Sequence, residues 1–288
     1  MEKWDGKTKG SLLGYRFFIF CIHTFGISVS YFFCYFVSIY FVLFGKKHRD
    51  GLIQFYSVGF GYSRKKARKL TYRNFYNFGK SLIDRIAMMS SKKRHFTYSF
   101  NNEKVLREMS DNQKGGILIS GHLGNWENAG NLIHERITNT INIVMLDAEV
   151  EKIKSFLELK TGGPKYNLIP IKNDLSHLII IHKALKRNEL IALHADRTSE
   201  GAKALELDFL KGKANFPIGP FILAQKFKVP ITFVYAVKTT KFHYELYATD
   251  PLEGLDAENI ARKYVKHLEE MVLKYPTQWF NFYKYYVD

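Results

Sequence analysis

His122 and Glu127 are the residues whose types and spacing point most directly to catalysis. They stand five positions apart in the stretch 117–127, which reads Ile-Leu-Ile-Ser-Gly-His-Leu-Gly-Asn-Trp-Glu. A histidine can take the proton from an attacking hydroxyl, and a carboxylate can hold its imidazole in the useful tautomer and stabilise the imidazolium that forms. The pair therefore indicates an enzyme that activates a hydroxyl group, with His122 as general base and Glu127 as its orienter.

The residues around this pair predict a corner between a strand and a helix. The apolar run before His122 is typical of a short buried strand, Gly121 and Gly124 allow a tight turn, and a helix is predicted at 126–136. In one continuous helix, side chains five residues apart point about 140° apart, so His122 must lie in the turn and Glu127 in the first helical turn. The spacing alone also permits a histidine that caps the helix and is satisfied in the core.

The rest of the chain alternates between predicted strands and helices. Helices are expected at 102–111, 126–136, 149–160, 174–187, 217–227 and 256–274, and strands at 116–120, 141–146, 167–171, 189–194, 230–238 and 242–248. Two helices are expected within 51–89, with an edge strand near 95–100. This order predicts an α/β fold with a central, mostly parallel sheet flanked by helices. Ligands of such sheets gather at the carboxyl ends of strands, and His122 and Asp196 both follow strand ends, which predicts a common site.

The stretch 120–127 resembles the His-x4-Glu signature of the late acyltransferases of lipid A biosynthesis, the lauroyl/myristoyltransferase family. Three further blocks resemble that family in the same order: a strand-end block at 191–197, a loop block at 208–220 and a closing Pro-x-Gln-aromatic segment at 276–280. The resemblance implies an enzyme that moves a fatty acyl chain from acyl carrier protein, or less readily from acyl-coenzyme A, to a hydroxyl of a lipid acceptor. It further implies the bacterial inner membrane, with the catalytic domain on the cytoplasmic face, and no metal or redox cofactor.

Departures from the family pattern concern the acceptor. A Tyr-Arg pair usual in the strand after the His-x4-Glu helix is replaced here by Ile-Val-Met-Leu-Asp at 143–147. Asp196-Arg197 stands where Asp-Gln is more frequent. The loop at 216–219 reads Phe-Pro-Ile-Gly and so lacks the glutamate of the related glycerophosphate acyltransferases. These differences leave open whether the acceptor is a lipid A precursor or a related glycolipid or aminolipid.

Three candidate substrate-binding residues lie in the first two blocks. Asn125 either contacts a substrate or caps the helix. Asp196 and Arg197 either position a substrate or complete a charge network with Glu127; a surface ion pair at a strand end is the alternative reading.

Two more candidates lie in the loop block. Gly219 opens a predicted helix, whose backbone N–H groups suit a phosphate such as that of a phosphopantetheine arm. Lys211 adds positive charge nearby, although basic loop residues are usually only solvated.

An apolar segment at 17–44 contains no Asp, Glu, Lys or Arg. As one helix it would extend over roughly 42 Å, more than the approximately 30 Å hydrocarbon core of a bilayer. A single tilted membrane helix is therefore predicted, with residues 1–50 as the anchor and 51–288 as the acyltransferase domain. An interfacial or re-entrant hairpin and a buried core helix are the alternatives. Aromatic residues near the C-terminus are also expected to dock at the bilayer interface, namely Trp279, Phe280, Tyr283, Tyr285 and Tyr286.

The net charge of +16 calls for an acidic partner. The densest basic cluster, at 64–69, follows the apolar segment and is predicted to face anionic lipid. Acyl carrier proteins are acidic and suit the same charge, whereas no recognition motif supports binding to nucleic acid. The two cysteines, Cys21 and Cys34, both lie in the apolar segment and indicate neither a disulfide framework nor a metal site.

Two hypotheses of other classes remain from the residues alone. One is a metal-dependent hydrolase in which His122, Glu127, His194 and Asp196 hold a divalent ion, since histidine and carboxylate are suitable ligands. The other is a non-catalytic basic membrane scaffold that recruits acidic partners.

Overall fold

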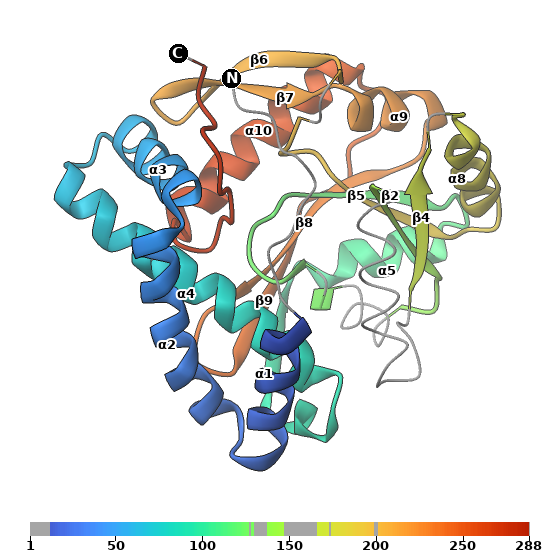
Figure 1. Cartoon of the computed structure of the whole chain (residues 1–288). Helices are drawn as coiled ribbons and strands as arrows, with labels where there is room; N and C mark the ends of the chain where they lie inside the picture. The colour runs from blue at the N-terminus through green and yellow to red at the C-terminus, as the bar shows by residue number, and fades with distance from the viewer. Residues whose placement is uncertain are drawn as a thin grey trace.

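A central sheet organises the computed structural model, which describes residues 12–126, 128–129, 137–146, 166–172, 174–198 and 201–287 (Figure 1). Within these ranges seven strands pair in the order β1-β9-β8-β2-β5-β3-β4. Neighbouring strands are parallel except β8 and β9. The strands are β1 (Thr97–Asn101), β2 (Gly116–Ser120), β3 (Ile141–Leu146), β4 (Asn167–Ile171), β5 (Leu190–His194), β8 (Ile231–Lys238) and β9 (His243–Ala248).

The two faces of the sheet have separate hydrophobic cores. Successive side chains of β2 alternate between them: Ile117 and Ile119 belong to one core and Leu118 to the other. The first core receives α8 (Ser176–Lys186), α9 (Gly219–Phe227) and α10 (Ala257–Lys274), and the second receives α5 (Glu103–Asp111). Every residue of β2 is buried, as expected for a strand covered on both faces. The predicted α/β class and mostly parallel sheet are confirmed.

A hairpin outside the main sheet was not expected from the sequence. β6 (Ala204–Phe209) and β7 (Gly212–Pro217) pair antiparallel, and Leu210 at their turn has φ 57°. Leu-Lys lacks the Asn-Gly or Asp-Gly signal that usually marks a two-residue hairpin turn, so the segment reads as a loop. The expected helix at 149–160 lies outside the described residues, as does most of the one at 126–136.

The apolar N-terminal segment forms two helices, so the prediction of one continuous helix is wrong. α1 (Leu12–Thr24) and α2 (Ile27–Phe44) are separated at Gly26, whose φ of 88° favours glycine, and they lie side by side (Figure 1). α2 is long and apolar enough to cross a membrane by length and composition. Its length of roughly 27 Å is close to the hydrocarbon thickness, so this helix can anchor the protein in a membrane.

Two helices join the apolar hairpin to the sheet, in agreement with the prediction for 51–89. α3 (Lys46–Gln54) continues through a short π-helical turn (Phe55–Gly59) and is followed by α4 (Arg64–Met88), which packs along α2. A Cβ at Gly79 of α4 would lie 2.3 Å from the Cys34 sulfur of α2. A short 3-10 turn (Ser91–His95) then leads into β1. α4 therefore connects the apolar helices to the body of the protein.

Candidate active site

His122 and Asp196 meet beyond the ends of two neighbouring strands. β2 and β5 are parallel, with Ser120 opposite His194, and each functional residue stands two positions further along. His122 Nδ1 lies 2.7 Å from Asp196 Oδ1, and the backbone N–H of His122 donates to Asp196 Oδ2 at 2.7 Å. The structure thus brings together the two strand ends that the sequence assigned to one site.

The C-terminal segment also donates hydrogen bonds to Asp196. Trp279 Nε1 donates to Asp196 Oδ2 at 2.9 Å, and the Tyr285 hydroxyl donates to the main-chain oxygen of Asp196 at 3.0 Å. Asp196 is only 1% exposed, which excludes the alternative of a surface ion pair. The aromatic residues expected to dock at the bilayer are themselves buried, so that expectation is wrong: Trp279, Phe280, Tyr283, Tyr285 and Tyr286.

Electrostatics keep Asp196 ionised and fix the tautomer of His122. Burial alone would raise the pKa of the Asp196 carboxyl, but the charge and hydrogen bond of His122, with the Arg197 guanidinium, outweigh it and hold that pKa below its ordinary value. An ionised carboxylate only accepts hydrogen bonds, so the proton in this contact belongs to Nδ1 of His122. In the neutral form of this ring, Nε2 keeps a lone pair, which is the arrangement that a general base requires.

Glycines allow the turn after β2 to pack closely. Gly124 has φ 73°, and a Cβ there would lie 2.0 Å from the carbonyl oxygen of Ala236. A Cβ at Gly121 would lie 2.9 Å from the Tyr264 hydroxyl and 3.0 Å from Asp196 Oδ2. The predicted tight turn is therefore present, and side chains larger than hydrogen at these positions would push the turn away from Asp196 and β8.

The substrate-binding candidates divide into two groups. Asn125 is buried, and its amide donates to the Ser81 carbonyl at 3.1 Å and to the Tyr244 hydroxyl at 3.3 Å. Arg197 donates to the Phe280 carbonyl at 2.6 Å, beside the site.

Lys211 and Gly219 lie at opposite ends of the β6–β7 hairpin and so about 20 Å apart. Both are exposed, and Gly219 is the first residue of α9. The structure does not bring these two together as one phosphate site. Glu127, the predicted orienter, lies outside the described residues.

Comparison with known protein families identifies the family of this chain. Residues 10–286 match the family model described as bacterial lipid A biosynthesis acyltransferase. The chain belongs to this family. A search among curated proteins gave no match. As a lipid A biosynthesis acyltransferase the protein is a transferase, which argues against the hydrolase and scaffold hypotheses.

The rival metal site of a hydrolase finds no support in the described part of this acyltransferase. No group of three or more His, Cys, Asp or Glu side chains there is arranged to hold a metal ion. His122 Nδ1 is engaged with Asp196, and Glu127 of the four-residue hypothesis lies outside the described ranges.

His194 packs directly against His122, the candidate general base of the acyltransferase. Its ring centroid lies 4.6 Å from that of His122 and 4.5 Å from that of Trp126. Burial, with a smaller contribution from the charge of His122, lowers the pKa of His194 to about 3. His194 is therefore neutral at physiological pH and forms an uncharged wall beside His122.

Replacing His194 by Phe should reduce the loss of stability in acid. The folded pKa of about 3 lies below the ordinary 6.5, so the unfolded chain takes up a proton that the folded protein does not bind as pH falls through this window. The free energy of unfolding that neutral His194 contributes is complete above the unfolded pKa. It decreases by about 1 kcal/mol per pH unit below that pKa. Thermal unfolding of both proteins between about pH 7 and pH 5 measures the difference; equal slopes would contradict the burial of a neutral histidine.

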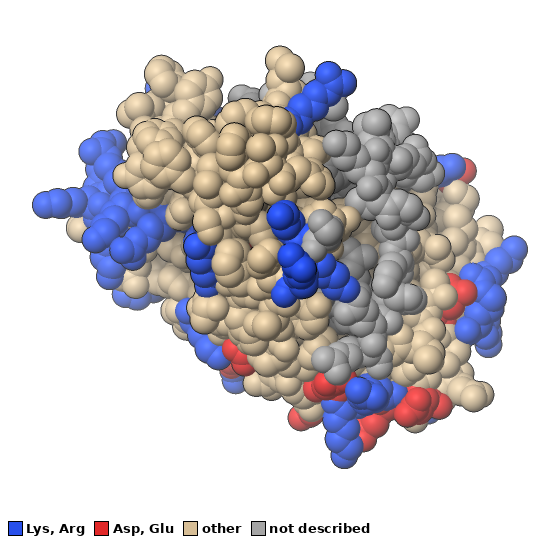
Figure 2. Space-filling view, turned by 90° about the horizontal axis from the view of Figure 1, so that it is seen from below, with Lys and Arg blue, Asp and Glu red and all other residues tan. Residues whose placement is uncertain are grey.

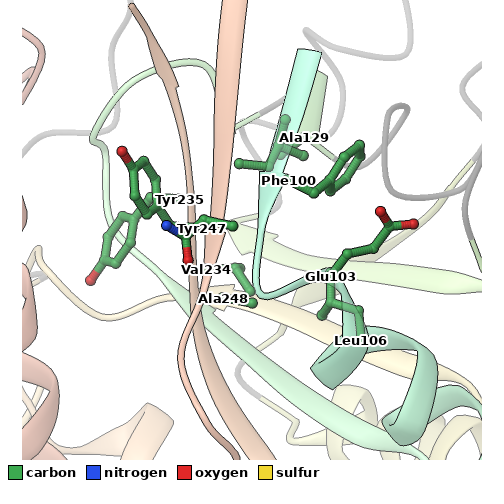
Figure 3. A pocket seen from close by; sticks show the side chains of 10 residues that line it. Phe100, Glu103, Leu106, Ala129, Val234, Tyr235, Tyr247 and Ala248 are labelled. Atoms are coloured by element: carbon green, nitrogen blue, oxygen red, sulfur yellow. The ribbon is translucent and has the colours of Figure 1, made fainter.

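An apolar crevice lies close to the segment that follows the catalytic turn (Figure 3). Phe100, Leu106, Val234, Leu246 and Ala129 contribute to its lining, and its volume is about 10 Å³, enough for roughly one water molecule. Figure 3 shows Ala129 beside Phe100, with Glu103 to one side. A space of this size does not hold an acyl chain.

Proposed function

We propose that this acyltransferase moves a fatty acyl chain from acyl carrier protein to a hydroxyl of a lipid acceptor, with His122 as general base and Asp196 as the carboxylate that orients it. The observation that carries the proposal is the 2.7 Å contact between His122 Nδ1 and the buried Asp196 carboxylate, in a chain whose family performs acyl transfer. The acceptor is a lipid A precursor or a related glycolipid.

The proposed reaction needs only this chain's residues and its two substrates. The acceptor oxygen attacks the thioester carbon while its proton passes to His122 Nε2, and the Asp196 carboxylate stabilises the imidazolium. When the tetrahedral intermediate collapses, the C–S bond breaks and the imidazolium returns the proton to the departing sulfur. The products are an acyl ester and the carrier thiol.

We also propose that the α1–α2 hairpin holds the enzyme at the cytoplasmic face of the bacterial inner membrane. The hairpin exposes large apolar side chains at several positions, including Phe20, Phe32, Phe36, Leu43 and Phe44. Exposed apolar surface of this extent is typical of contact with lipid. The view from below shows a broad area without charged groups, bordered by Lys and Arg, with Asp and Glu towards the lower and right edges (Figure 2).

The basic cluster at 64–69 is consistent with an anionic membrane surface. It occupies the first turns of α4, where Arg64, Lys65, Lys66, Arg68 and Lys69 are all exposed. Each cation near an anionic leaflet contributes about 1 kcal/mol to binding. Charge reversal in this cluster is therefore expected to act on membrane association more than on recognition of the donor.

Replacing His122 by Ala should abolish acyl transfer while the fold is kept. Loss of the general base is expected to lower kcat on the order of 10²- to 10⁴-fold. The assay is acyl transfer in membranes from labelled acyl carrier protein, with circular dichroism and thermal unfolding to show that the variant is folded. Wild-type activity in a folded His122→Ala protein would refute the proposed mechanism.

The donor proposal predicts a dependence on salt. Acyl carrier proteins are acidic, so their docking to an enzyme of net charge +16 is steered by electrostatics. This docking weakens as the Debye length falls from about 30 Å at about 0.01 M salt to about 8 Å at physiological ionic strength. Raising salt should therefore increase the KM for acyl carrier protein several-fold, and that for acyl-coenzyme A much less. Equal use of both donors without any salt effect would count against carrier protein.

A further inference from the structure

The packing of α2 restricts how the apolar hairpin can meet a membrane. The buried residues of α2 form one stripe along the helix, namely Ile27, Ser30, Tyr31, Cys34 and Ser38. Large exposed side chains form a second stripe on the opposite side at helical spacing, namely Phe32, Phe36, Tyr40, Leu43 and Phe44. The apolar surface offered by α2 therefore follows one side of the helix and does not surround it.

The body of the protein flanks the buried side of α2 from end to end. Near the start of the helix, Lys241 Nζ donates to the Ser28 hydroxyl at 2.8 Å. Near its other end, the Arg49 guanidinium donates to the Val42 carbonyl at 3.2 Å. These two contacts are about 21 Å apart along the helix axis. Charged groups are therefore fixed at both ends of α2.

Further charged groups lie between these ends. Lys238 of β8 and Asp84 of α4 form an ion pair, and the Tyr31 hydroxyl donates to Asp84 and accepts from Lys238 Nζ at 2.6 Å. A Cβ on the residue before Lys80 would lie 2.3 Å from the Cys34 sulfur. Because Cys34 is near the midpoint of α2, Lys80 lies level with the middle of the helix.

This packing is incompatible with a helix that crosses a bilayer. Standing along the membrane normal, α2 would extend through roughly 27 Å of a hydrocarbon core about 30 Å thick. Lys241, Lys80 and Arg49 would then be spread through that core, together with the end of the β8–β9 pair. Ionisable side chains and open sheet edges are both strongly disfavoured there.

We propose that the α1–α2 hairpin lies flat in one leaflet of an anionic bilayer and does not cross it. The proposal rests on the membrane association proposed above and adds its geometry. With α2 parallel to the surface, the exposed stripe enters the leaflet, as in other interfacial helices. The charged groups on the opposite side of α2 then stay at or above the phosphates of the same leaflet.

Charge favours a bilayer over a second copy of this chain as the occupant of the apolar surface. α1 lies at the lower end of the molecule in Figure 1, and the view from below shows an area without charged groups bordered by Lys and Arg (Figure 2). Two such borders would repel each other, whereas anionic headgroups complement them.

The depth of labels along α2 tests the orientation. Single nitroxide labels are attached to Phe32→Cys, Phe36→Cys and Leu43→Cys in the full chain, reconstituted into vesicles of phosphatidylethanolamine and phosphatidylglycerol. The native Cys21 and Cys34 are each 2% exposed, and mock-labelled wild type measures any reaction at them. Collisions with oxygen and with a water-soluble nickel chelate give the depths. We expect the three depths to agree within about 5 Å, whereas in a spanning helix Phe36 would lie about 10 Å deeper than Leu43.

Cysteines at the two ends of α2 give an independent measurement. Phe25→Cys and Lys46→Cys flank the helix at exposed positions. A membrane-impermeant maleimide, added to cells with a permeabilised outer membrane, reaches only the periplasmic side of the inner membrane. Neither cysteine should react until detergent is added. Reaction of either one in intact cells, or a Phe36 label about 10 Å deeper than the Leu43 label, would overturn the flat orientation.

The remaining arms separate this inference from the proposed function. His122→Ala should give the same depths as wild type, so a loss of activity does not affect this result. Lys263→Cys, exposed on α10, is the control for a label in water. Labels on α2 that behave like this control would overturn the inference whether or not acyl transfer is confirmed. Spin–spin broadening on α2 that disappears on dilution with unlabelled protein would show a second copy on this surface and would also overturn it.

Discussion

An Asp196→Asn enzyme is expected to lose acyl transfer by a factor on the order of 10³ to 10⁴ in kcat. The amide cannot stabilise the imidazolium, and its NH₂ group can turn towards His122 Nδ1 and favour the wrong tautomer. The substitution alters the 2.7 Å contact between His122 Nδ1 and Asp196 Oδ1. Single-turnover acyl transfer measures the effect, and thermal unfolding shows whether the variant is folded.

Two further variants make this experiment decisive about which carboxylate orients His122. Trp279→Phe removes one hydrogen bond to Asp196 and should reduce kcat far less than Asp196→Asn does. Glu127→Gln is compared under the same conditions. If Glu127→Gln abolishes activity while Asp196→Asn remains near wild type, the orienting role belongs to Glu127, as the sequence spacing first indicated.

Removing either charge of the Asp84–Lys238 pair should destabilise the protein by about 3–5 kcal/mol. Asp84 is fully buried, and Lys238 also donates to the Tyr31 hydroxyl at 2.6 Å. Asp84→Ala or Lys238→Met would leave the opposite charge without a partner. Chemical denaturation monitored by tryptophan fluorescence, in detergent, measures the change in the free energy of unfolding.

The double replacement is the control for this buried pair. Asp84→Leu combined with Lys238→Met removes both charges and should be clearly more stable than the sum of the single effects, because no unpaired charge is left. Strictly additive losses would show that the two side chains do not interact.

Strands and helices were predicted well where the pattern of apolar and polar side chains within a few residues is enough to define them. Apolar runs located β2 (Gly116–Ser120) and β3 (Ile141–Leu146) at their observed bounds. Local patterns failed where tertiary contacts decide. The break at Gly26 was predicted only as the alternative of a helical hairpin, because the segment is apolar on both sides of it. The Leu-Lys turn of the β6–β7 hairpin carries no turn signal.

The candidate site was predicted in part for the same reason. His122 stands in a recognisable motif, and the placement of Asp196 after a strand predicted that it would be near. That β2 pairs directly with β5, and that Asp196 therefore reaches His122 Nδ1, depends on strand order, which the pattern of strands and helices does not determine. Nothing in the sequence around Trp279 predicted its hydrogen bond to Asp196. A tryptophan beside a candidate active site and one in a hydrophobic core cannot be distinguished by sequence alone.

The contact between Trp279 and Asp196 has a consequence for biosynthesis. Chains fold progressively from the N-terminus as they are made, at roughly 5–20 residues per second. The apolar hairpin of α1 and α2 leaves the ribosome early, whereas Asp196 obtains its indole partner only after Trp279 has been synthesised. On the proposed function, the hairpin can therefore reach the bilayer before His122 and Asp196 are fixed in place, and we expect membrane delivery to precede the onset of activity.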